Sequence, residues 1–294
     1  MKRLAILTII LLFSAAWSAA QPQGTGWEAS DKVFGATGKD LPGDVHRYGW
    51  PRSDLHVTVG GVAVAPALAL GSWAGFKKTG NGDEAMTMGD LVLLGSEVDP
   101  VIGELQGAGF EILAIHNHLI GETPRVIYVH FYGHGDPAAL AKTLKAALAK
   151  TKTPAPGTPA AKPTPAEEKA FEKLQDALGH KGTMAGTVLQ VGVARAEPIK
   201  DGGMEVPANM GMNNPMNFQT VGERIATTGD FVLIADEVNP VAKELRVHGI
   251  AVTALHSHML RETPRLFFMH FWGVDTPEKI AEGLKAALSR IATK

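Results

Sequence analysis

Three histidines, a glutamate and an arginine occur twice in this chain with the same spacing. They are His116, His118, Glu122, Arg125 and His130, followed 140 positions later by His256, His258, Glu262, Arg265 and His270. Around them, segments 89–150 and 229–290 agree at 28 of 62 positions without a gap. A hydrophobic core does not require these polar residue types. Their recurrence therefore indicates a polar functional site.

The spacing of the first three histidines fits a metal site if both segments around them are strands. Alternate residues of a strand point to the same face at a rise of ~3.3 Å per residue, so His116 and His118 share a face. If the next strand returns antiparallel around 122–124, His130 lies opposite His116, where Cβ atoms are ~4.5–5.5 Å apart. Three converging imidazoles can then reach one ion at the ~2.0–2.1 Å typical of zinc.

The sequence predicts one such site in each repeat. The metal ligands are His116, His118 and His130 in the first repeat and His256, His258 and His270 in the second. Zinc is the first candidate among the divalent ions. Copper, manganese, iron and nickel remain open, because ligand type alone does not choose the metal.

The connection between the two strands adds candidate catalytic and binding groups. Glu122 and Glu262 could complete the coordination or act as a general base toward a metal-bound water. Arg125 and Arg265 offer a planar fork for a carboxylate or a phosphate. The alternative is that each arginine only pairs with the neighbouring glutamate.

Other readings of this stretch stay open. A buried network of histidine, glutamate and arginine can be purely structural and only fix a hairpin, and common ancestry of the repeats would preserve part of it. A non-enzymatic pocket for an anionic small molecule or a cell-wall fragment is a further alternative. The chain has no Gly-rich phosphate motif, GxSxG elbow or HExxH helix. Whether it is an enzyme, and on which substrate, therefore stays undecided.

The two strands belong to a longer pattern that both repeats share. A turn at Gly89-Asp90 precedes a short buried strand at 91–94, and a helix is expected to begin at the Asp99-Pro100 pair. Strands at 111–118 and 125–132 and an amphipathic helix at 137–150 follow. Residues 229–291 repeat this β-α-β-β-α pattern. Glu97, just before the helix, is a further site candidate, with a solvated carboxylate near a helix N-terminus as the alternative.

The N-terminal half of each repeat is rich in strands. Expected elements are helices over 27–34 and 167–178, strands over 45–52, 71–77 and 187–195, and hairpins around Gly60-Gly61 and Gly202-Gly203. The strands at 45–52 and 187–195 each end in an arginine. The fold class predicted is α+β, with two tandem homologous β-rich repeats that each end in a β-α-β-β-α unit.

The N-terminal segment and a proline-rich segment set the expected bounds of the two repeats. Residues 1–20 read as a signal peptide, with two basic residues, an apolar run over 4–13 and a small-residue end, so a periplasmic or secreted protein is expected. The first repeat then covers 26–150, a linker with five prolines covers 151–165, and the second repeat covers 166–294.

Composition limits the partners. The chain has no cysteine, so neither disulfides nor thiolate metal sites are expected. The formal net charge of −2 does not favour nucleic acid or an anionic membrane surface. After signal cleavage we expect no membrane insertion, and the expected partner is a small-molecule or cell-envelope ligand. The sequence does not indicate an oligomeric state.

The motif combination resembles one known family. The segments concerned are Gly-Asp-Leu-Val-Leu at 89–93, Glu-Val-Asp-Pro at 97–100, His-Asn-His-Leu at 116–119, Glu-Thr-Pro-Arg at 122–125 and the segment from His130 to Pro137. In these five segments the chain resembles the exported bacterial LppY/LpqO family, DUF1259. The resemblance covers nearly the whole chain after the signal peptide, and it implies export without an established activity. Some members are lipoproteins, from which this chain departs because it has no cysteine to acylate.

Overall fold

Two similar halves, each built on a six-stranded antiparallel sheet, make up the protein. The computed structural model describes residues 26–80, 83–155 and 161–294. The predicted α+β fold with two tandem β-rich repeats is confirmed. The predicted signal peptide and residues 156–160 of the predicted linker lie outside the described residues.

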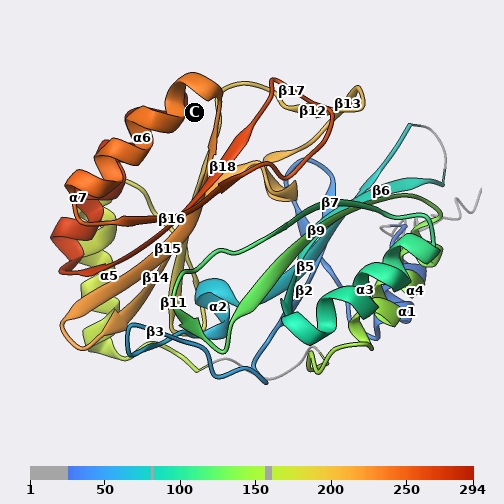
Figure 1. Ribbon diagram of the computed structural model, residues 1–294, viewed down its shortest axis with the longest axis horizontal. Helices are drawn as coiled ribbons and strands as arrows, with labels where there is room; N and C mark the ends of the chain where they lie inside the picture. Colours follow the sequence, from blue (N-terminus) through green and yellow to red (C-terminus); the bar gives the residue numbers. More distant parts are fainter. Residues whose placement is uncertain (1–25, 81–82, 156–160) are drawn as a thin grey trace, which may run out of the picture.

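The first repeat forms the sheet at the right of Figure 1. Its strands, in sheet order, are β1 (Lys39–Leu41), β2 (Val45–Pro51), β5 (Gly71–Lys78), β6 (Ala85–Leu94), β9 (Val126–Gly135) and β7 (Glu111–His116). The helices of this repeat are α1 (Glu28–Phe34), α2 (Pro66–Ala69), α3 (Gly95–Gly107) and α4 (Pro137–Leu148). Helices α1, α3 and α4 cover the outer face, where their apolar side chains join the core around Phe131.

The second repeat has the same arrangement at the left of Figure 1. Its strands, in sheet order, are β10 (Thr183–Ala185), β11 (Val188–Ala194), β14 (Asn213–Val221), β15 (Arg224–Leu233), β18 (Phe267–Asp275) and β16 (Ala251–His256). Helices α5 (Pro165–Leu178), α6 (Ala235–Val247) and α7 (Pro277–Leu288) cover its outer face around Phe271. A short 3-10 helix, η1 (Ala208–Met210), takes the place that α2 has in the first repeat.

In each repeat a three-stranded sheet includes the connection that follows the His-x-His pair. In the first repeat the strands β3 (Thr58–Val59), β4 (Val62–Ala63) and β8 (Glu122–Thr123) form one of them, and in the second the strands β12 (Lys200–Asp201), β13 (Met204–Glu205) and β17 (Glu262–Thr263) form the other. The predicted Gly-Gly hairpins are therefore confirmed. The hairpin β3–β4 turns at two glycines with positive φ, a backbone region that favours glycine.

The sheet faces opposite the outer helices are turned toward each other, and α2 lies between them (Figure 1). Apolar side chains of both repeats meet there in one cluster, which includes Val45, Met86 and Met88 of the first repeat and Val232, Met259 and Phe268 of the second. Polar contacts add to the docking, because the side-chain amides of Gln190 and Asn217 donate to the carbonyls of Ala67 and Leu68 in α2, at 3.0 and 2.9 Å. The repeats thus pack as one unit around a shared interior.

The predicted turn at Gly89-Asp90 is wrong, because β6 runs through it without interruption. Gly89 is needed there for space rather than for a turn. A Cβ on Gly89 would lie 2.1 Å from the carbonyl oxygen of Trp73 and 2.6 Å from the ring of Phe131. Gly229 has the same surroundings, with Pro215 and Phe271 in the corresponding places. The recurring Gly-Asp pair therefore marks a close approach inside the sheet.

Replacing Gly89 by alanine is expected to destabilise the protein by about 2 kcal/mol, because overpacking at a site that cannot yield costs roughly 1–3 kcal/mol. The matched control is Gly103→Ala in α3, where nothing lies within 4 Å of the added Cβ. That change should stabilise the helix by about 0.5–1 kcal/mol. Urea unfolding of both variants measures the difference. Equal effects of the two substitutions would contradict this account of Gly89.

The helix α3 begins five residues before Pro100, the first helical residue predicted from Asp99-Pro100. Its start at Gly95 is stabilised by Glu97, whose carboxylate accepts a hydrogen bond from the backbone N–H of Leu94 at 2.8 Å. The same carboxylate accepts from the guanidinium of Arg52 at 2.7 Å, and both side chains are buried. Glu97 is therefore a buried ion-pair partner, and the solvated role considered for it does not hold.

Candidate functional site

All six recurring histidines meet in one cluster between the two sheets. The rings pair across the repeats, with ring centroids 3.8 Å apart for His116 and His256, 3.7 Å for His118 and His270, and 3.7 Å for His130 and His258. Each pair joins a histidine of the first repeat to one of the second. Replacing every histidine by its equivalent in the other repeat gives the same three pairs. The histidines therefore form a single centre with approximate two-fold symmetry, rather than the two separate sites expected from the sequence.

The strand register that brings them together differs from the expected one. In the β7–β9 pair, His130 lies opposite Ala114, two residues from the expected partner His116, and His116 lies opposite Tyr128. A bulge also shifts the register between Ile112 and Ala114. His116 and His130 are therefore diagonal neighbours on one face, with ring centroids 5.0 Å apart. The strand also ends at His116 rather than at residue 118.

His118 lies beyond the end of β7 and is held in place by ring packing. Its imidazole stacks on Tyr128 at 3.4 Å, and its Nε2 lies 3.1 Å from Nε2 of His116. The equivalent ring of His258 stacks on Phe268 at 3.6 Å. Each of these histidines is thus enclosed between an aromatic ring of its own repeat and a histidine of the other repeat.

The hydrogen bond of His270 leaves one nitrogen of its ring free. Nδ1 of His270 lies 3.0 Å from the carbonyl oxygen of Gly229, and because a carbonyl only accepts, Nδ1 carries the proton. The lone pair of Nε2 in His270 is then buried without a partner, as is Nε2 of His130. A carbonyl partner on one ring nitrogen is the usual second-shell arrangement of a metal-ligating histidine.

The ring nitrogens of the cluster lack hydrogen-bond partners to an unusual degree. Within the described residues the buried unpartnered atoms include Nδ1 of His116, Nε2 of His130, both nitrogens of His256, and Nε2 of His258 and His270. Leaving buried polar atoms unpaired costs about 1–3 kcal/mol each. So many in one place need an explanation, and a bound cation would supply one.

Burial keeps these histidines neutral. It lowers the pKa of His116 to about 2, with the charge of His256 as a second cause, and it lowers the pKa of His256 to about 4. The pKa values of the other four lie well below the ordinary value, also mainly through burial. A neutral imidazole is the form that binds a metal ion.

Two buried aspartates, one from each repeat, complete the polar centre. Asp90 lies opposite His130 on the neighbouring strand, and its Oδ2 is 3.4 Å from Nε2 of His118 and 3.7 Å from Nε2 of His130. Asp230 has the matching position in β15, 3.7 Å from Nε2 of His258. Burial raises the pKa of Asp90 to about 8, although the charge of Arg47 acts against this.

Asp90 and Asp230 were missed as site residues by the sequence reasoning, which assigned them to turns. A usable signal was present, because a charged residue recurs unchanged inside a buried apolar run in both repeats. Such a residue is rarely buried without a partner or a function.

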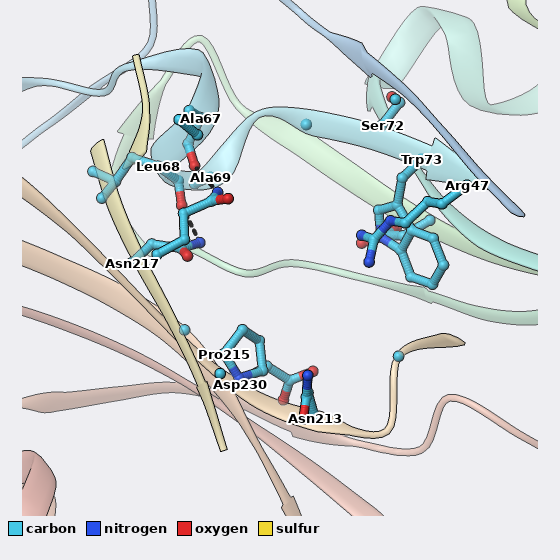
Figure 2. A pocket seen from close by; sticks show the side chains of 18 of the residues that line it. Arg47, Ala67, Leu68, Ala69, Ser72, Trp73, Asn213, Pro215, Asn217 and Asp230 are labelled. Carbon is cyan, nitrogen blue, oxygen red and sulfur yellow. Dashed lines mark hydrogen bonds between the residues drawn. The ribbon is translucent and has the colours of Figure 1, made fainter. Parts of the chain in front are cut away.

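A cavity of about 640 Å³ opens between the sheets beside this centre. Its lining includes four of the six histidines and both aspartates, namely His118, His130, His258, His270, Asp90 and Asp230. Figure 2 shows Arg47 and Trp73 on one wall and Asn213, Pro215 and Asp230 on the facing one. A small molecule in this space could therefore contact the histidines directly.

The glutamates and arginines predicted for the site lie elsewhere. Glu122 and Glu262 are buried in the short strands β8 and β17, and Glu262 accepts from the backbone N–H of Leu266 and from Arg265, at 3.1 and 3.3 Å. Arg125 and Arg265 are exposed. The residues that line the cavity include none of these four. The structure thus brings together the predicted histidines but not the predicted catalytic and anion-binding groups.

The histidines fit a metal ion in two overlapping sets. One set is His116, His118 and His130, and the other is His116, His256, His258 and His270, with ligand atoms within 4.8 Å of one another in each set. Three or four imidazole nitrogens match the ligands that zinc accepts in proteins. The second set contains residues of both repeats, so an ion held there would tie the repeats together.

A family model described as Domain of Unknown Function (DUF1259) matches the chain twice, over residues 28–150 and 172–290. Each match covers one repeat and contains one trio of histidines. No curated protein matches the chain. Within the described residues, no helix has both the length and the apolar character that crossing a membrane requires.

Two solved structures that match are a trimeric bacterial microcompartment shell protein, PduB, and EtuB from Clostridium kluyveri. PduB is 12% identical, with 86% of this chain and 90% of PduB covered and a TM-score of 0.21. EtuB is 11% identical, with the same coverage and a TM-score of 0.20. At these TM-scores the likeness supports no statement about fold or function.

Proposed function

Because the chain belongs to the DUF1259 family, whose description assigns no function, we propose its function from the site alone: it is a protein that binds a divalent transition-metal ion among the six histidines shared by its repeats. The observation that carries this proposal is the group of buried ring nitrogens without hydrogen-bond partners. In His270 the carbonyl-bound Nδ1 leaves Nε2 available to a metal.

Zinc is the ion that the proposal names first, because neutral imidazoles in a three- or four-ligand set suit it. Copper, manganese, iron and nickel are the alternatives. His116 belongs to both ligand sets and offers one ligand atom to each, so the sets cannot be filled independently. We therefore expect about one ion per chain, in place of one ion per repeat.

Metal-dependent hydrolysis is the reaction class that we propose for the centre. A set of three histidines leaves a coordination position open, as in catalytic zinc sites. A metal there would act as a Lewis acid and lower the pKa of bound water. His118 and His130 line the cavity, and Asp90 beside them can hold or release a proton. The export predicted from residues 1–20 would place this activity in the periplasm or outside the cell.

The experiment is metal analysis by mass spectrometry of protein purified without a histidine tag, before and after incubation with zinc and removal of free ion. We expect about one equivalent of transition metal in the native protein. The double variant His116→Gln/His256→Gln should lose it, because it removes ligands from both sets. The matched control is His56→Gln, since His56 is exposed and remote in sequence from the cluster.

Circular dichroism of the double variant in chelator shows whether it still folds. A folded double variant that lacks metal, beside a His56 variant that retains it, supports the proposal. Native protein that contains no stoichiometric transition metal and takes none up would refute it.

A further inference from the structure

Arg47 presents a positive charge to the cavity without a charged partner. It lies in the middle of β2, half-buried, and its guanidinium stacks over the ring of Trp73 at 4.0 Å. Its one hydrogen bond to a described residue is long, from Nη1 to the carbonyl oxygen of Asn209 at 3.4 Å. Among the described residues no carboxylate lies within 4.0 Å of it. Asp90 affects it only through longer-range attraction.

The second repeat shows that docking of the repeats does not need this charge. Arg47 pairs with Gly75 in the β2–β5 ladder, and Gln190 pairs with Asn217 at the equivalent position of the β11–β14 ladder. Gln190 donates to the carbonyl of Ala67 in α2, just as Arg47 donates to the carbonyl of Asn209 in η1. A neutral amide therefore suffices for the contact across the interface, so the charge of Arg47 needs a different reason.

The wall around Arg47 also differs between the repeats. Trp73 pairs with Gly49, whereas Pro215 pairs with Gly192 at the matching place. Stacking on an indole holds a guanidinium in one plane and leaves its N–H edge free for a planar oxyanion. The amide of Asn213, on the facing wall in Figure 2, adds a neutral hydrogen-bonding group. Only one side of the cavity thus carries this stacked cation.

We propose that Arg47 and Trp73 form an anion subsite, which binds the carboxylate or phosphate group of a small molecule whose remainder lies in the cavity against the histidines. The subsite indicates which class of ligand would bind beside the proposed metal centre. It depends on the proposed metal binding only for the role of the histidines. It replaces Arg125 and Arg265 as the anion-binding groups. The cavity volume of about 640 Å³ is in the range of small-molecule sites.

The test is calorimetric titration of the full chain with inorganic phosphate and, in a separate series, with acetate, each in chelator and after zinc loading. Arg47→Gln copies the residue of the second repeat, so it should keep the fold and the docking contact. We expect it to weaken binding of the preferred anion at least about tenfold, since a hydrogen bond to a charged group contributes about that factor or more. Arg47→Lys should retain part of the affinity.

Arg125→Gln is the matched control, because Arg125 is exposed and does not line the cavity. Equal losses for Arg47→Gln and Arg125→Gln, or wild-type protein that binds neither anion in either state, would overturn the subsite. Metal content, measured on the same Arg47→Gln sample, should match the wild type. Anion binding in chelator by a protein that takes up no metal would support the subsite while rejecting the metal centre, so the two proposals fail separately.

Discussion

Removal of the proposed metal ion is expected to lower the melting temperature of the protein by roughly 10 °C. A ligand that binds only the folded state adds about 4 kcal/mol to the free energy of unfolding at a thousandfold excess over its dissociation constant. For a chain of this size about 1 kcal/mol corresponds to roughly 2–4 °C. The unfolded chain holds no such site, because the ligands His116 and His256 lie on strands of different repeats.

Differential scanning calorimetry with chelator, and again after zinc is restored, measures this effect. Because the histidines of both repeats share one centre, metal should shift the unfolding of both repeats together, in a single transition. The control is His116→Gln/His256→Gln, whose melting temperature should not respond to chelator. A melting temperature that stays constant while the metal is demonstrably removed would contradict a stabilising centre between the repeats.

Much of each repeat could be predicted from local patterns. The Gly-Gly hairpins, the helices that end at glycine and the two strands around the histidines follow from residue types and short-range periodicity. The histidines themselves stand out because polar residues recur at one spacing while their neighbours change, as Asn117 and Ser257 do. Apart from that recurrence, which compares segments 140 positions apart, these signals are local in the chain.

The shared centre could not be predicted in the same way, because it depends on how the two sheets pack. The alternation along β9 places His130 on the face opposite α1, α3 and α4, but nothing local shows that the same face of the other sheet covers it. Pairs such as His116 with His256 are 140 residues apart. The bulge in β7 also shifts the register by one residue, which pattern reading does not detect.

Two further errors have a physical cause in tertiary contacts. Gly89-Asp90 reads as a turn because glycine and aspartate favour turns, yet Gly89 is required by the ring of Phe131. Asp99-Pro100 reads as a helix start, yet the buried carboxylate of Glu97 provides an earlier one. Arg47 could not be identified as a site residue from the repeats. Its counterpart in the second repeat is Gln190, and comparison of the repeats singles out only residues that recur.

The largest loss of stability from a single substitution is expected at Glu97. Its carboxylate accepts two hydrogen bonds from the guanidinium of Arg52, at 2.7 and 3.1 Å, and the Arg52 side chain is fully buried. Glu97→Ala leaves that charge with Asp54 as its remaining ionic partner. Removing one member of a buried ion pair costs about 3–5 kcal/mol, and because Asp54 stays, we expect about 3 kcal/mol.

Glu104→Ala is the matched control, because Glu104 on the same helix pairs with Lys150 at 3.3 Å where both are partly exposed. Such surface pairs contribute about 0–1 kcal/mol. Urea unfolding of both variants gives the comparison, and a loss at Glu97 no larger than that at Glu104 would contradict the assigned role. The second repeat offers a replicate, since Arg195 and Glu237 form the same pair at 2.6 Å.

The same variant separates a structural role of Glu97 from a role in the site. Arg52 directly follows β2 and Glu97 lies in the first turn of α3. Their pair therefore joins the end of the strand that carries Arg47 to the helix that follows the strand of Asp90. If this pair only supports the scaffold, folded Glu97→Ala protein should retain the metal content of the wild type. Loss of metal from variant protein that remains folded would instead place Glu97 among the groups on which the centre depends.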